Sequence, residues 1–159
     1  MTDWIEAGQE APNFNLRSDR GESVTLGDFA GRPVILYFYP KDDTPGCTRE
    51  ACAFRDRKSE IASRGAVLLG VSPDEIDSHA AFRDKYDLNF PLLADPLHAV
   101  AERYGAWREK NMYGKKPMGI QRSTFLIDPE GVVRKVWKRV QIDDHDEQVL
   151  QALDELTQD

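Results

Sequence analysis

The sequence predicts a three-layer α/β domain in which helices flank a mixed central β-sheet. Two continuous apolar runs, Val34–Tyr39 and Val67–Ser72, have the composition of buried central strands. A segment with helical spacing separates them, which predicts a helical crossover between parallel strands. Near the C-terminus, two further apolar runs flank a short Pro/Gly turn, which predicts an antiparallel hairpin in the same sheet.

The first strand follows the turn residues Gly31–Pro33, and further turn residues occupy Pro40–Gly46. A helix is then predicted over about Cys47–Ser63, and Arg64 and Gly65 end it. Its apolar positions keep helical spacing at Ala51, Phe54, Ile61 and Ala62, with the aliphatic stem of Lys58.

After the second strand, the sequence predicts a helix over Ser78–Tyr86 and a short helix over His98–Tyr104. The inward positions of the first of these helices are Ala81, Phe82 and Tyr86. The hairpin joins Ser123–Ile127 to Val132–Trp137. A terminal amphipathic helix, Asp144–Leu156, has its apolar stripe at Val149, Leu150, Leu153 and Leu156.

Length and charge limit the classes of protein. The chain has 159 residues, so we expect a single domain over residues 1–159 whose first ten or so form an acidic lead-in. A net charge of −7 with scattered basic residues argues against nucleic-acid binding. No apolar stretch approaches the ~18 residues of a membrane span, and the N-terminus lacks a secretory signal. We therefore expect a cytoplasmic protein, and a monomer.

The chain has two cysteines, Cys47 and Cys52. A cytoplasmic chain of this length does not need a structural disulfide. A zinc site would need four ligands at close spacing, whereas the histidines are dispersed, so we expect no metal.

Cys47 is predicted to stand at the start of a helix. Thr44 is a good N-cap residue, and Pro45 then occupies the first helical position, where its missing N–H costs nothing. Cys47 becomes the third helical residue, where free backbone N–H groups and the helix dipole favour the thiolate. The alternative is a buried cysteine that acts as a small hydrophobic residue. From its own sequence neighbours, without regard to Cys47, Cys52 is predicted to be an inert core residue.

These residues resemble the peroxiredoxin family. Pro40, Thr44 and Cys47 have the spacing of its active-site motif, Pro-x₃-Thr-x₂-Cys. The run Gly46–Cys52 is similar to the signature of the peroxiredoxin Q (bacterioferritin comigratory protein) subgroup. The run Gly119–Asp128 resembles the segment that supplies the family's active-site arginine, here Arg122. The resemblance extends over about residues 8–156.

The resemblance implies a thioredoxin-like fold and reduction of hydrogen peroxide and organic hydroperoxides, with no cofactor. It makes Cys47 the peroxidatic nucleophile, which becomes a sulfenic acid, and Cys52 the resolving thiol of an atypical two-cysteine enzyme. Thioredoxin or a related dithiol would then reduce the disulfide.

The chemistry explains why the other motif residues are needed. Lowering a thiol pKa from about 8.5 to about 6 raises its thiolate fraction at pH 7 only ~30-fold. The leaving oxygen must therefore also be stabilised. Arg122 can hold both sulfur and peroxide oxygen with its fork of donors, and the Thr44 hydroxyl can add another. Pro40 would shield the sulfur from water, and Glu50, one turn beyond the nucleophile, could orient Arg122.

A disulfide between Cys47 and Cys52 would require motion. Five residues apart on an intact α-helix, their Cα atoms would be ~8.5 Å apart. A disulfide needs Cα atoms within about 7 Å, so the first turns must unwind.

Two other functions stay open from the sequence. One is a thiol–disulfide oxidoreductase that acts on proteins, although the spacing is Cys-x₄-Cys rather than Cys-x-x-Cys. The other is a non-enzymatic holdase, which would consume no peroxide.

Overall fold

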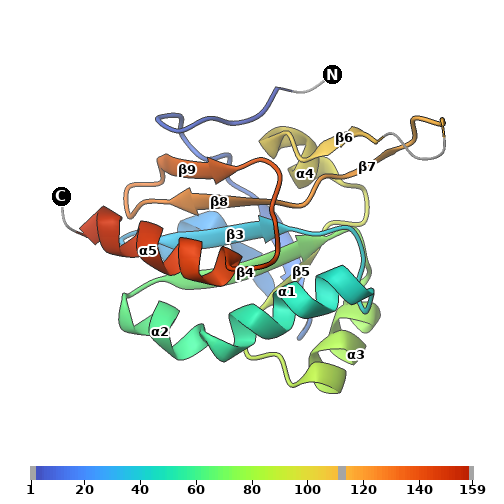
Figure 1. Cartoon of the computed structure of the whole chain (residues 1–159), viewed down its shortest axis with the longest axis horizontal. Coiled ribbons are helices and arrows are strands. Elements are labelled where there is room, and N and C mark those ends of the chain that lie inside the picture. Colours follow the sequence, from blue (N-terminus) through green and yellow to red (C-terminus); the bar gives the residue numbers. More distant parts are fainter. Residues whose placement is uncertain (1–2, 111–113, 158–159) are drawn as a thin grey trace.

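The computed structural model describes residues 3–110 and 114–157. Its central sheet contains β1 (Asn15–Ser18), β2 (Ser23–Thr25), β3 (Val34–Phe38), β4 (Val67–Ser72), β5 (Leu92–Ala94), β8 (Ser123–Ile127) and β9 (Val133–Trp137). The strands lie in the order β2-β1-β5-β4-β3-β8-β9 (Figure 1). Two short strands, β6 (Trp107–Glu109) and β7 (Met118–Ile120), form a separate antiparallel ribbon.

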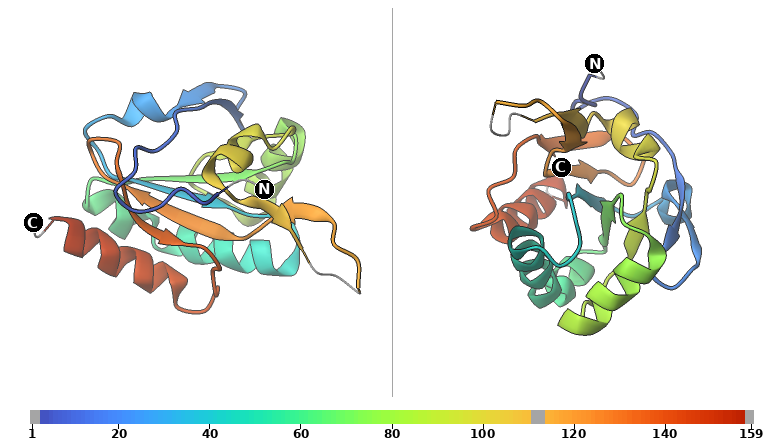
Figure 2. Two further views of the ribbon diagram at one scale, coloured as in Figure 1. Left: turned by 90° about the horizontal axis from the view of Figure 1, so that it is seen from above. Right: turned by 90° about the vertical axis from the view of Figure 1, so that its right-hand side faces the viewer.

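The helices are α1 (Pro45–Asp56), α2 (Lys58–Ser63), α3 (Ile76–Tyr86), α4 (Ala99–Tyr104) and α5 (His145–Thr157), with a short 3₁₀ helix at Leu26–Phe29. Helices α1, α2, α3 and α5 cover one face of the sheet, and α4 lies on the other with the N-terminal segment (Figure 2). This three-layer arrangement confirms the predicted fold class. In the described part of the chain, no helix has both the length and the hydropathy to cross a membrane.

The sheet is mixed because β3 has one parallel and one antiparallel neighbour. It pairs in parallel with β4 and antiparallel with β8, where Phe38 lies opposite Ser123. The predicted crossover between β3 and β4 and the hairpin of β8 and β9 are confirmed. The antiparallel register brings the start of β8 beside the end of β3, and this juxtaposition positions the site described below.

The side chains of β3 alternate between two buried cores. Ile35 and Tyr37 face α1, where they pack with Phe54, and Leu36 and Phe38 face the α4 side. The aromatic ring of Tyr37 lies against Gly70 of the neighbouring strand β4, so a Cβ at Gly70 would come within 2.9 Å of it.

The sequence missed five short strands. β1, β2, β5, β6 and β7 have only three or four residues each, too few to show a period. The inward face of α3 was also partly wrong. Ala81 is exposed, whereas His79 is fully buried because its ring nitrogens have polar partners inside the protein.

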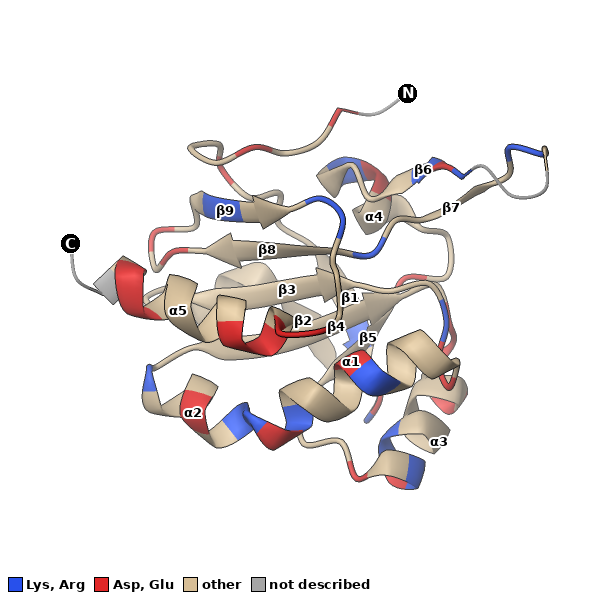
Figure 3. Cartoon of the chain, in the orientation of Figure 1, with Lys and Arg blue, Asp and Glu red and all other residues tan. Residues whose placement is uncertain are grey.

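The predicted helix over residues 47–63 is two helices that meet at Arg57, where φ is −107° and ψ is 7°. The guanidinium of Arg57 binds Asp146 at 3.2 Å and Glu147 at 2.6 Å, both in the first turn of α5, and Glu60 at 3.2 Å. The acidic first turn of α5 lies on the same side of the sheet as α1 and α2 (Figure 3). The sequence shows the apolar spacing of both helices but not this long-range ion-pair group.

Candidate active site

Cys47 stands near the start of α1, as predicted. Thr44 is the N-cap residue with extended backbone angles, Pro45 is the first helical residue and Cys47 the third. The Cys47 residue is 2% exposed, in contact with the core below α1. The amides of Gly46 and Cys47 lie in the first turn, where helix geometry leaves N–H groups without an intrahelical acceptor. The site therefore places a sulfur beside free donors.

The side chain of Thr44 does not cap the helix. Its hydroxyl donates to the Lys41 carbonyl at 2.9 Å, back within the loop that joins β3 to α1. This bond uses its proton, so the Thr44 oxygen is left to accept a hydrogen bond. Pro40 is half-buried at the start of the same loop.

Arg122 connects Cys47 to Glu50. It lies in the link between β7 and β8, which the register of β8 against β3 places beside the loop into α1. One guanidinium nitrogen, Nη2, is 3.2 Å from Cys47 Sγ, and the other, Nη1, donates to Glu50 Oε1 at 2.6 Å. Its side chain is only 17% exposed. The fork thus holds the sulfur and a carboxylate at fixed relative positions.

Glu50 is 2% exposed, and its carboxylate is poorly solvated. Burial raises the pKa of Glu50 to about 7, because the cost of a buried charge outweighs the attraction of Arg122. Among the described residues, its second oxygen, Oε2, has no hydrogen-bond partner. Burial alone would lower the pKa of Arg122, but Glu50 and then Cys47 raise it. Arg122 therefore stays charged between the two groups.

Cys52 lies on the same continuous helix as Cys47, half-buried, and both are free thiols. Five residues of intact helix place their Cα atoms ~8.5 Å apart. The structure therefore brings Cys47, Glu50 and Arg122 together and keeps Cys52 away from them.

Lys110 is a cation near this site that the sequence did not indicate. Its aliphatic stem lies over β7, 3.3 Å from where a Cβ of Gly119 would stand. Burial lowers the pKa of Lys110, and the nearby charge of Arg122 lowers it further. No motif includes Lys110, because the β6–β7 ribbon that places it has too few residues to be recognised.

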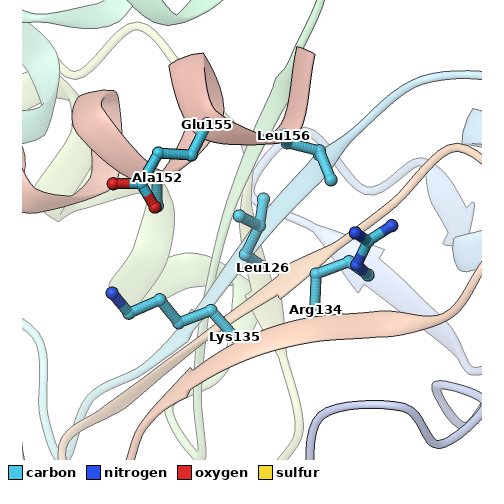
Figure 4. A pocket seen from close by; sticks show the side chains of 6 residues that line it. All are labelled: Leu126, Arg134, Lys135, Ala152, Glu155 and Leu156. Atoms are coloured by element: carbon cyan, nitrogen blue, oxygen red, sulfur yellow. The ribbon is translucent and has the colours of Figure 1, made fainter. Parts of the chain in front are cut away.

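A separate cavity of about 280 Å³ lies between the outer strands β8 and β9 and the C-terminal half of α5 (Figure 4). Six residues line it: Leu126, Arg134, Lys135, Ala152, Glu155 and Leu156. It shares no residue with the group around Cys47.

Comparison with known proteins agrees with this geometry. The model of the AhpC/TSA family matches residues 7–136. The peroxiredoxin Bcp of Bacillus subtilis (strain 168) is 49% identical over 154 residues, which cover 97% of this chain and 98% of the relative.

Two solved structures from Xanthomonas campestris are similar over almost their whole length. Peroxiredoxin Q has a TM-score of 0.89 at 42% identity and covers 94% of this chain and 97% of its own. The bacterioferritin comigratory protein, solved in a study of its alkyl peroxide reduction activity, has a TM-score of 0.87 at 39% identity and covers 98% of each chain. Family match, relative and structural neighbours together make this chain a member of the AhpC/TSA family and, within it, a peroxiredoxin of the Bcp and peroxiredoxin Q group.

Proposed function

We propose that this thiol-dependent peroxidase reduces hydrogen peroxide and organic hydroperoxides through the Cys47 thiolate. The observation that carries the assignment is the contact of Arg122 with Cys47 Sγ at 3.2 Å. The thiolate attacks the terminal oxygen of ROOH, so an S–O bond forms as the O–O bond breaks. Cys47 becomes a sulfenic acid, and the departing RO⁻ takes up a proton to give the alcohol, or water from hydrogen peroxide.

Arg122 stabilises the negative charge as it moves from sulfur to the leaving oxygen. A guanidinium is always charged and presents donors in a fixed plane, so it can bind both atoms. The free amide of Cys47 adds a donor, and the Thr44 oxygen accepts a hydrogen bond from the peroxide hydroxyl. Pro40 shields the sulfur from water. Glu50 orients the guanidinium through the 2.6 Å bond to Nη1.

Cys52 resolves the sulfenic acid. Its thiol attacks Cys47 Sγ, the S–OH bond breaks, and water leaves as the disulfide forms. Because both residues lie on α1, this step requires the helix to unwind. A dithiol reductant of the thioredoxin type then reduces the disulfide by thiol exchange. We propose that this cycle takes place in a single-domain, cytoplasmic monomer.

The assignment is tested by peroxide consumption with a thioredoxin system. Cys47→Ser is expected to abolish consumption, while Cys52→Ser reduces about one peroxide per protein and then stops. The two variants carry the same atomic change five residues apart, so each controls for the other. Full turnover by Cys47→Ser would overturn the nucleophile, and sustained turnover by Cys52→Ser would overturn the resolving step. Insulin reduction without peroxide consumption would indicate a protein disulfide oxidoreductase instead.

A further inference from the structure

A buried polar cluster lies beside the loop that joins β3 to α1, outside the group around Cys47. Its centre is the pair Asp42 and His79, which are 7% and 0% exposed. Asp42 belongs to the loop, two residues before the N-cap of α1, and His79 belongs to α3. A buried carboxylate and imidazole are costly unless each polar atom is paired, so their contacts indicate what they hold in place.

The carboxylate of Asp42 has a partner for each oxygen. Oδ1 accepts from the Tyr39 hydroxyl at 2.6 Å, and Oδ2 accepts from the Ser78 hydroxyl at 2.8 Å. Oδ2 also lies 2.7 Å from His79 Nδ1. The backbone amide of Asp42 donates to Asp74 Oδ2, again at 2.7 Å. The loop is therefore fixed at Asp42 through both side chain and backbone.

Both ring nitrogens of His79 have a hydrogen-bond partner. Its Nε2 is 3.0 Å from the carbonyl oxygen of Leu93 in β5, and a carbonyl can only accept, so Nε2 carries a proton. Nδ1 faces the carboxylate oxygen Asp42 Oδ2 at 2.7 Å, which is the second hydrogen bond of the ring. His79 thus ties the loop to β5 through two hydrogen bonds. Asp42, Asp74 and His79 are close enough to hold a metal ion, but these bonds already use the atoms that would ligate it.

The next residue anchors the loop to α3 a second time. Asp43 has a left-handed backbone with φ of 58°, and its carboxylate accepts from Lys85 Nζ at 2.8 Å and from the Tyr86 hydroxyl at 2.7 Å. Thr44 follows directly and begins α1. The position of the first turn, and of Cys47 against Arg122, therefore depends on how firmly the loop is held.

We propose that His79 is a positioning residue for the peroxidase reaction. Its bond to Asp42 fixes the loop carrying Pro40 and Thr44, and thereby the distance between Cys47 Sγ and the Arg122 guanidinium. This inference rests on Cys47 as the attacking thiolate. The anchor matters most after each unwinding of α1, since the helix must re-form with its first turn in the same place.

Two substitutions separate this role from simple packing. In His79→Asn the amide nitrogen stands near the position of Nδ1 and keeps the bond to Asp42. In His79→Gln it stands near that of Nε2 and keeps the bond to Leu93. Each variant keeps one of the two hydrogen bonds, so we expect similar losses in melting temperature. His98→Asn and His98→Gln, at a half-buried histidine that stacks on Trp107 of β6, are the controls for the chemical change itself.

The readout is the second-order rate constant of the reduced full-length protein with hydrogen peroxide. We expect His79→Asn to react within about threefold of wild type and His79→Gln at least tenfold more slowly. Ser78→Ala removes the hydrogen bond that the Ser78 hydroxyl donates to the same Asp42 oxygen and leaves the His79 bonds in place. It should slow the reaction about threefold. It keeps the test open if a His79 variant does not fold.

Equal rates in the two His79 variants, or an unchanged rate in Ser78→Ala, would overturn the positioning role. The nucleophile assignment is judged separately by Cys47→Ser, whichever way the His79 variants react.

Discussion

Arg122 reaches Cys47 across the one residue of the helix start that has no side chain. Arg122 Nη2 is 3.2 Å from Cys47 Sγ, and a Cβ at Gly46 would stand 3.2 Å from the same nitrogen. Gly46 is therefore needed for a close approach of the guanidinium rather than for an unusual backbone conformation. The Cys47 sulfur, the Arg122 guanidinium and the backbone of Gly46 therefore lie in direct contact, and the first two predictions concern this contact.

Replacement of Arg122 by Met should lower the second-order rate constant with hydrogen peroxide by 10² or more, about 3 kcal/mol. This is the usual loss for one donor that stabilises developing charge. Arg122→Lys should recover little, because an ammonium cannot contact Cys47 and Glu50 as a fork does. Stopped-flow measurement of the first turnover checks both variants. A Met variant within a few-fold of wild type would assign charge stabilisation to other groups.

Gly46→Ala should slow the same reaction by about three- to tenfold without lowering the melting temperature. The added methyl group would stand 3.2 Å from Arg122 Nη2 and 3.4 Å from Ile142 Cδ1. The guanidinium must therefore shift by a few tenths of an ångström away from its position beside Cys47. Alanine is the better helix former, which offsets the crowding in stability. Gly27→Ala is the control, since the nearest atom that its Cβ would meet among the described residues is Thr25 Oγ1 at an ordinary 3.8 Å. An unchanged rate constant in Gly46→Ala would show that the Arg122 guanidinium accommodates the methyl group and still stabilises the reacting sulfur.

Glu50→Gln should gain stability relative to wild type as the pH rises from 4.5 to 8. The pKa of Glu50 is about 7 in the folded protein against 4.5 ordinarily, so the folded state holds a proton that the unfolded chain has released. Its contribution is fully present below pH 4.5 and is lost as the pH rises to about 7, on the order of 3 kcal/mol in total. Glutamine does not titrate.

Urea unfolding of wild type and Glu50→Gln between pH 4.5 and 8 provides the measurement. The difference in unfolding free energy should move in favour of the variant as the pH rises. A difference that stays constant across this range would mean that Glu50 titrates at its ordinary pKa.

Oxidation should remove the hydrogen-exchange protection of residues 44–54. Cys47 and Cys52 share one continuous helix, and a disulfide between them is incompatible with its geometry. Hydrogen exchange of the reduced and peroxide-treated proteins, with the disulfide verified by mass, tests this. Cys52→Ser treated in the same way should keep its protection. Equal protection in both redox states of the wild type would contradict the proposed unwinding.

The sequence predicted the positions of the proposed reacting residues better than their surroundings. Pro40, Thr44 and Cys47 are close in sequence, so local helix-start rules and a motif identify them together. Arg122 is 75 residues from Cys47 and was found because its own segment resembles a known one. The contact of Glu50 with Arg122 followed from the position of Glu50 one helical turn beyond Cys47.

The cluster around Asp42 could not be predicted in the same way. Its pairing with His79 joins a loop to a helix 37 residues away, and the pattern placed Ala81 rather than His79 on the inward face. Periodicity counts apolar side chains, so it overlooks a buried histidine whose partners belong to other elements. The Thr44 side chain differs for a related reason: the Lys41 carbonyl competes for its hydroxyl.

The break at Arg57 separates α1, which carries both cysteines, from α2. Helix unwinding spreads readily along a continuous helix, because each turn supports the next. An uninterrupted helix over residues 45–63 would carry the disruption to Ile61, which is fully buried. The ion pairs of Arg57 with Asp146 and Glu147 instead hold the junction against α5. In the proposed cycle, α1 can therefore unwind while the rest of the core stays folded, and the helix can re-form against that core.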